Sequence, residues 1–134
     1  MDIAELDTVA EDDGIVVTLK DVTGEPMIAT DTQQPLTLKV AGAFSDRYRA
    51  AQKRLTNKRI QATKRGAGDL DADAIEDNEL ALEAACIIEW PFVSGGQPFP
   101  ISLTNWKALV QKQPQWQGQV WSAMHDHAGF FAPR

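Results

Sequence analysis

The sequence has little of what builds covalent cross-links, zinc centres or membrane spans. Its one cysteine, Cys86, excludes an internal disulfide and a cysteine-based zinc site. Cys86 lies among apolar neighbours in AACIIE, which is typical of a small core residue and not of a nucleophile. No apolar run approaches the roughly 18 residues that a membrane-spanning helix needs. We therefore expect no membrane partner.

A basic leader segment is also missing. The chain starts with the acidic stretch MDIAELDTVAEDDG, whereas a secretory or organellar signal is basic. We therefore expect the protein to stay in the compartment where it is made. The formal net charge of −6 at pH 7 argues against nucleic acid as the main partner of the whole chain. With 134 residues, 43% hydrophobic and 24% charged, the composition fits one soluble globular domain, or one domain with an attached arm.

The first third of the chain predicts a small antiparallel β-meander. A run of β-branched residues over 14–19 and an alternating pattern over 36–40 indicate two strands, and 27–30 is a candidate for a short strand between them. Turn-forming residues over 21–26 and 31–35 separate these segments. Two or three short strands are only marginally stable alone. The sheet must therefore pack on a helix or on another copy of the chain.

Helical turns are expected on either side of this meander. Residues 1–13 have apolar positions three apart, which fits one or two amphipathic turns that dock onto something. Ser45 is a suitable N-cap for a second helix. That helix has a narrow apolar face, and most of the 13 basic residues of the chain lie in it, between Arg47 and Arg65.

This basic helix has three interpretations. An acidic block of matching size follows at 69–89, so the two blocks can face each other, within one chain or between copies, or can simply be solvated. The helix can also bind an acidic protein partner, with Arg54 and Arg59 as candidate contacts. The third interpretation is binding to nucleic-acid phosphates through the basic helix 47–65. Interleaved aromatic residues are missing there apart from Tyr48, which makes nucleic acid the least favoured partner.

The second half of the chain predicts helices. Gly and acidic residues over 66–73 indicate a linker. The next helix is expected from about Ala74 to Glu89, where Trp90-Pro91 ends it, and its later part is apolar on most sides, as in a buried helix.

Two more helices follow it. Ser102 or Thr104 caps the first, and Pro114 fits the first turn of the second. Gly129 is expected to end the last helix, with Phe130-Phe131 folding back onto the core.

The predicted fold class is therefore α+β, with a small N-terminal antiparallel β-meander followed by a mainly α-helical C-terminal half. The expected organisation is a meander plus basic helix over 1–65, a linker over 66–73 and a helical region over 74–134, together forming one compact unit.

The large aromatic residues concentrate between Leu80 and Phe131, so the core is expected there. They are too numerous for one small core to bury completely, and an exposed apolar patch usually marks a partner site. The candidate partner-binding residues are Trp90, Phe92, Phe99, Trp106, Trp116 and Trp121.

Catalytic or metal chemistry is not predicted. The segment His125-Asp126-His127 is the only metal-like cluster, but its histidines lie about 200° apart on a helix and no further ligands follow at a recognisable spacing. The favoured interpretation is a helix C-terminus that suits imidazolium. No Ser, His and Asp arrangement assembles a triad, and no loop fits phosphate. We expect no catalytic residue, no metal and no cofactor.

Taken together, these segments resemble the tail assembly chaperones of long-tailed bacteriophages (siphophages). The resemblance covers nearly the whole chain as a pattern of spacing and residue type. It rests on the N-terminal segments ELDTVAEDD, DVTGEPM, LTLKVAG and SDRYRAAQKRLTNKRI, and on ALEAACIIEW, PFPIS and a Pro-Gln-Trp helix start in the C-terminal half. The chain departs from the family at HDHAGFF, where a charged Asn-Phe ending is expected.

The resemblance implies a protein that is not an enzyme and that acts in virion morphogenesis in the host cell cytoplasm. Such chaperones bind the tape measure protein, keep it soluble and promote tail tube assembly, so the major tail tube protein is a possible second partner. Two alternatives remain: a structural virion component, such as a tail or head–tail connector protein, and a nucleic-acid-binding regulatory protein that uses the basic helix.

Overall fold

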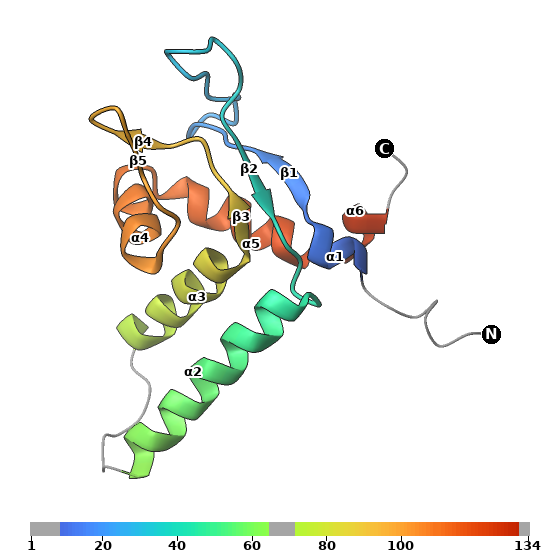
Figure 1. The fold of residues 1–134 in the computed structure, drawn as a ribbon, viewed down its shortest axis with the longest axis vertical. Helices are drawn as coiled ribbons and strands as arrows, with labels where there is room; N and C mark the ends of the chain where they lie inside the picture. The colour runs from blue at the N-terminus through green and yellow to red at the C-terminus, as the bar shows by residue number, and fades with distance from the viewer. Residues whose placement is uncertain (1–8, 65–71, 132–134) are drawn as a thin grey trace, which may run out of the picture.

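The computed structural model describes residues 9–64 and 72–131. Figure 1 shows β1, β2 and β3 in front of α5, with α4 to the left of them and α2 and α3 extending away from the sheet. The α+β class is confirmed, because antiparallel strands near the N-terminus precede a mainly helical second half. The elements in chain order are α1 (Val9–Asp13), β1 (Ile15–Thr18), β2 (Thr37–Val40), α2 (Asp46–Lys64), α3 (Ala72–Cys86), β3 (Ile87–Glu89), β4 (Val93–Ser94), β5 (Gln97–Pro98), α4 (Leu103–Lys112), α5 (Gln115–His125) and α6 (His127–Phe131).

The main sheet has three antiparallel strands in the order β1-β2-β3, and β4 and β5 form a separate hairpin. β1 and β2 pair from Ile15 opposite Val40 to Thr18 opposite Thr37. Gly14 precedes β1 with a φ of +84°, and a Cβ atom there would lie 2.9 Å from the carbonyl oxygen of Val40. The start of β1 therefore requires glycine, for its backbone conformation and for the close approach of β2.

The structure corrects two of the predicted segments. The helix expected to continue to Glu89 ends at Cys86, and Ile87 to Glu89 form β3, which pairs with β2. Two successive β-branched residues at this point complete the sheet better than they continue a helix. The residues over 27–30 form no strand, and this region makes only isolated bridges, Lys20 with Pro26 and Ile28 with Pro35.

The core lies between the inner face of the sheet and the helices behind it. Alternate residues of β1 and β2 point to this face, as the two-residue period of a strand requires. α3 and α5 pack against each other, and α5 contacts β1 and β2. Among the described residues, the largest apolar side chains that are fully buried are Leu19, Leu38, Val40, Ile87, Trp106, Val120 and Met124. Burial raises the pKa of the Cys86 thiol to about 11, so this cysteine is a core residue and is not a thiolate at neutral pH.

The two predicted serine N-caps are confirmed, whereas Pro114, predicted in the first turn of a helix, precedes α5 as its N-cap residue. Ser45 Oγ accepts a hydrogen bond from the Tyr48 amide at 3.2 Å, and Ser102 Oγ accepts one from the Asn105 amide at 3.1 Å. α5 ends at His125 with Asp126 as its C-cap, so the prediction that Gly129 ends this helix is wrong.

Beyond α5 the chain forms a short helix of its own, α6. The predicted fold-back of Phe130-Phe131 holds for Phe130 alone, because Phe130 is buried and Phe131 is 55% exposed.

The acidic segment of α1 attaches the N-terminal part of the chain to the start of α2. Glu11 is fully buried, and its Oε1 accepts hydrogen bonds from the Phe44 amide at 3.0 Å and from the His127 ring at 2.9 Å. Asp12 Oδ1 accepts one from the Asp46 amide at 2.6 Å. The expected docking of residues 1–13 thus has a structural basis over 9–13, whereas residues 1–8 lie outside the described part.

The predicted linker over 66–73 falls mostly on residues 65–71, which lie outside the described ranges. Its last two residues belong to α3, which begins at Ala72. Within 9–64 and 72–131, none of the helices combines the length and apolarity that crossing a membrane requires.

Candidate partner-binding surface

The structure separates the six predicted aromatic residues into two sets. Trp106 and Trp116 are 0% and 4% exposed, so they are core residues and are removed from the set of candidate partner contacts. Trp106 is fixed there because its Nε1 donates a hydrogen bond to Glu83 at 2.9 Å. The half-buried residues, which keep part of their surface available to a partner, are Trp90, Phe92, Phe99 and Trp121.

Three of these residues form one group around the β4–β5 hairpin. Trp90 stacks on Phe99 with ring centroids 5.9 Å apart and meets Phe92 edge-on at 5.6 Å. Trp90 Nε1 donates a hydrogen bond to the carbonyl oxygen of Phe99, and Phe92 stacks on the buried Trp116 at 5.5 Å. The group therefore packs on the core through Phe92, and its three rings remain partly exposed to solvent.

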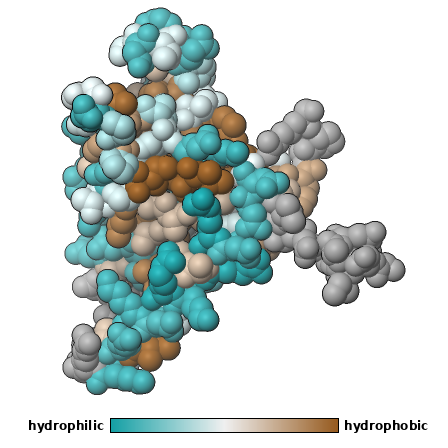
Figure 2. All heavy atoms as spheres, viewed as in Figure 1, coloured by the Kyte–Doolittle hydropathy of each residue, from teal (hydrophilic) through white to brown (hydrophobic). Residues whose placement is uncertain are grey.

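Trp90 also lines a shallow groove on the outer face of the main sheet. The groove has a volume of about 250 Å³ and is lined by Val16, Thr37, Leu38, Lys39, Glu89, Trp90 and Pro91. Val16 is 64% exposed, although it lies in the middle of β1. Lys39 and Glu89 are opposite each other on β2 and β3 and add one charge of each sign. Figure 2 shows hydrophobic side chains gathered across the middle of this face, where Figure 1 places the strands.

The fourth half-buried residue, Trp121, belongs to a different aromatic group near the start of α2. Trp121 lies 4.5 Å from the ring of His125, which meets Tyr48 edge-on at 6.0 Å. His127 stacks on Phe44 with centroids 3.7 Å apart and an interplanar angle of 10°. A hollow of about 430 Å³ opens beside this group, lined by Ala43, Phe44, Tyr48, Arg49, Gln52, His125 and His127.

Hydrogen bonds fix the orientation of the two histidines. His125 Nδ1 is 2.9 Å from the carbonyl oxygen of Trp121, which can only accept, so Nδ1 carries the proton. His127 Nδ1 is 2.9 Å from the buried carboxylate of Glu11. The Asp126 carboxylate accepts from the Gly129 amide instead of facing the histidines. Among the described residues, no group of three or more His, Cys, Asp or Glu side chains could hold a metal ion.

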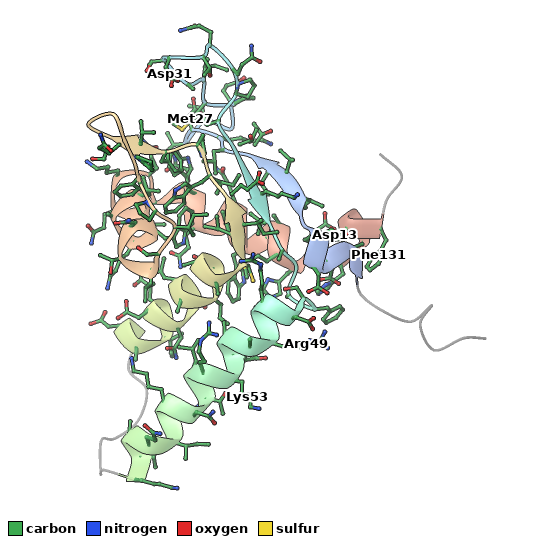
Figure 3. All side chains as sticks on the ribbon, in the orientation of Figure 1. Asp13, Met27, Asp31, Arg49, Lys53 and Phe131 are labelled. Carbon is green, nitrogen blue, oxygen red and sulfur yellow. The ribbon has the colours of Figure 1, made fainter. Side chains whose placement is uncertain are left out.

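The basic helix α2 is exposed along most of its length. Of its residues only Ala51 is buried, and Arg54 and Arg59 are both exposed. Arg49 pairs with Asp46 on the same helix at 2.9 Å. Figure 3 shows Arg49 and Lys53 on the side of α2 away from α3. No ion pair between described residues connects α2 with α3, so the expected pairing of basic and acidic blocks within one chain is not formed by direct contacts.

Among the described residues, Glu83 is the carboxyl group whose pKa is raised most, and it lies in the core. It is fully buried, and burial raises its pKa to about 7, against the opposing effect of the hydrogen bond from Trp106. Such a pKa suits a general acid or base. Glu83 is closed off from solvent, however, and it lines none of the hollows described above. Its position fits a polar contact between α3 and α4.

Sequence reasoning missed the contributions of Val16, Phe44 and Tyr48 to these surfaces. The sequence predicts Val16 and Phe44 only as parts of a strand and of a helix start. The two-residue period of β1 does predict the orientation of Val16, because even-numbered residues point to the face of the sheet that Val17 and Leu19 do not share. No signal in the sequence shows that the far side of this sheet is left uncovered by a helix.

Comparison of the chain with protein-family models, with curated proteins and with solved structures finds no match.

Proposed function

We propose that this protein binds another polypeptide, and that it is a tail assembly chaperone of long-tailed bacteriophages whose client is the tape measure protein. The observation that supports the proposal best is the groove on the sheet, whose lining includes Trp90 and the exposed Val16. An apolar surface that a folded protein leaves open usually serves a partner. The resemblance of the sequence to this chaperone family supplies the identity of the client.

The groove suits a client that presents an apolar stripe. A long helical protein that has not yet been enclosed by the tail tube exposes such stripes, and they must be covered to prevent aggregation. A shallow groove of about 250 Å³ buries few side chains. Binding of moderate strength follows, which would let tail tube subunits displace the chaperone in the host cytoplasm.

Co-expression with the genes that neighbour this one tests the proposal. Purification of the tagged chain should recover the tape measure protein, and the untagged chain should be absent from mature particles. Recovery of DNA alone would favour a regulatory role of the basic helix. Presence of the chain in purified particles would favour a structural virion component. Either result would refute the chaperone proposal.

Two exposed valines provide a matched pair of variants for the same experiment. Val16→Glu places a carboxylate in the groove, whereas Val22→Glu changes an 82% exposed residue that does not line it. Both side chains are largely in solvent, so neither change removes a core contact. We expect the first variant to lose the tape measure protein and the second to retain it.

A further inference from the structure

At the end of the α2–α3 pair that points away from the sheet, the tip, the described residues of the two helices carry charges of opposite sign and exposed apolar side chains. α2 contains seven basic residues and one acidic residue, whereas α3 contains five acidic residues and no basic one. Each helix also exposes one isoleucine near the tip, Ile60 at 47% and Ile75 at 48%. A surface that combines both signs of charge with apolar anchors is suited to self-association.

The exposed face of α2 is not the face that packs inside the chain. Tyr48, Ala51 and Leu55 form the stripe toward the body of the protein. At about 100° per residue, Ile60 lies about 140° around the helix from Leu55. Ile60 lies instead in a hollow of about 470 Å³, lined by Thr56, Arg59, Ile60, Thr63 and Lys64. Its lining combines the apolar Ile60 with two basic residues, Arg59 and Lys64, which we call the basic rim.

The start of α3 presents the matching features. Ile75 is seven residues before the buried Leu82, so the two lie on nearly the same face of the helix. Nearer the core this face is covered, whereas Ile75 is half exposed. Asp73 and Glu76 flank Ile75 and are exposed, and they make no ion pair with described residues. Asp77 is already paired, because its carboxylate is 2.9 Å from Lys107 Nζ on α4.

We propose that two copies of this chain associate through these tips, with Ile75 of one copy in the Ile60 hollow of the other. Around a twofold axis each contact occurs twice, so the basic rim of each α2 meets Asp73 and Glu76 of the other copy's α3. The two blocks of opposite charge, which form no ion pair with each other among the described residues, thereby face each other between copies. This proposal does not depend on the identity of the client, because the sheet groove lies on other elements.

Charge reversal tests the arrangement, because a twofold interface of opposite charges can be broken in two complementary ways. Arg59→Glu with Lys64→Glu places acidic residues at the Ile60 hollow, so that they face the acidic Asp73 and Glu76 of the other copy. Asp73→Lys with Glu76→Lys places basic residues beside Ile75, so that they face the basic hollow. Each double variant should be monomeric by light scattering where the unchanged protein is dimeric. An equimolar mixture of the two variants should form a heterodimer, because both contacts are then between opposite charges.

Three measurements complete the test. Circular dichroism and thermal unfolding establish that both double variants keep the fold. Lys112→Glu, a change of the same charge on α4, should remain dimeric. Dimerisation should weaken as salt is raised, because exposed charges are screened.

Two results would overturn the proposal. The first is that the unchanged protein stays monomeric at low salt through the micromolar range. This holds also if the monomer binds duplex DNA through α2. The other is a mixture of the two reversed variants that stays monomeric.

Discussion

Glu83 is a carboxyl group that folding moves into the core, next to the indole of Trp106. Its pKa rises from an ordinary 4.5 to about 7, mainly because burial disfavours the charged form. Between these two values the folded protein holds a proton that the unfolded chain releases. The contribution of Glu83 to stability is therefore greatest below the unfolded pKa, declines as the pH rises toward about 7, and stays at its minimum above it.

Glu83→Gln should remove this dependence. The amide keeps an acceptor for Trp106 Nε1 and carries no charge to desolvate. We expect the variant to gain about 1–2 kcal/mol in the free energy of unfolding at pH 8, and to show no gain near pH 4.5. Urea unfolding over this pH range measures the difference. Glu89→Gln, at an exposed position, is the control and should follow the unchanged protein at every pH. A parallel pH profile for Glu83→Gln would contradict the raised pKa.

Gly14 is a residue at which backbone conformation and close packing act together. Gly14→Ala should lower the free energy of unfolding by about 2–4 kcal/mol, since the new Cβ would collide with the Val40 carbonyl in a backbone with positive φ. Gly24 has a φ of +90° but no atom within 4 Å of its Cβ position. Gly24→Ala should therefore cost only the left-handed strain, about 1 kcal/mol. Equal losses of unfolding free energy for Gly14→Ala and Gly24→Ala, measured by thermal or urea unfolding, would show that the close approach of β2 to Gly14 does not affect stability.

At the scale of the elements, α5 provides a substitution that should stabilise the fold. Gly118 lies inside this helix with nothing within 4 Å of its Cβ position. Gly118→Ala should add about 0.5–1 kcal/mol, because alanine loses less conformational freedom on folding. Gly95→Ala is the same chemical change at a φ of +57° in the β4–β5 turn and should have the opposite sign. Thermal unfolding of both variants measures these changes in stability. A lower stability of Gly118→Ala would mean that α5 is not a regular helix at this position.

The elements differ in how far the sequence predicts them. β1 and β2 are visible in the sequence because β-branched and alternating residues have a period of two, and α2 is visible because Ser45 caps a long polar helix. β3 is not, because Ile87 and Ile88 follow an apolar helix without a turn residue between them. Their strand is created by pairing with Val40, which is far away in the sequence. Local patterns hold no information about such a partner.

The same limit applies to the candidate surface. The sequence identifies the aromatic residues that build it, but burial depends on which elements come together. Trp106 and Trp90 both lie near the end of a helix or strand, but their surroundings differ. Glu83 of α3 accepts a hydrogen bond from Trp106 in the core. Trp90 instead donates to the Phe99 carbonyl beside the hairpin and lines the groove.

At the scale of the whole molecule, the described part of the chain is a small sheet with helices on one face and no helix on the other. The open face carries the groove, and the α2–α3 pair extends away from it with charges of opposite sign (Figure 1). The proposed client-binding surface and the proposed self-association surface thus lie on different parts of the chain. The double charge reversals should leave client binding intact, and Val16→Glu should leave the dimer intact.

The central claim, that the open face of the sheet holds a polypeptide, is tested most directly by calorimetric titration of the purified protein with a helical segment of the tape measure protein. The account predicts saturable binding with a negative heat-capacity change from buried apolar surface. Binding should be at least about tenfold weaker for Val16→Glu and unchanged for Val22→Glu. Equal affinities for the two variants, or no binding by the unchanged protein, would contradict it.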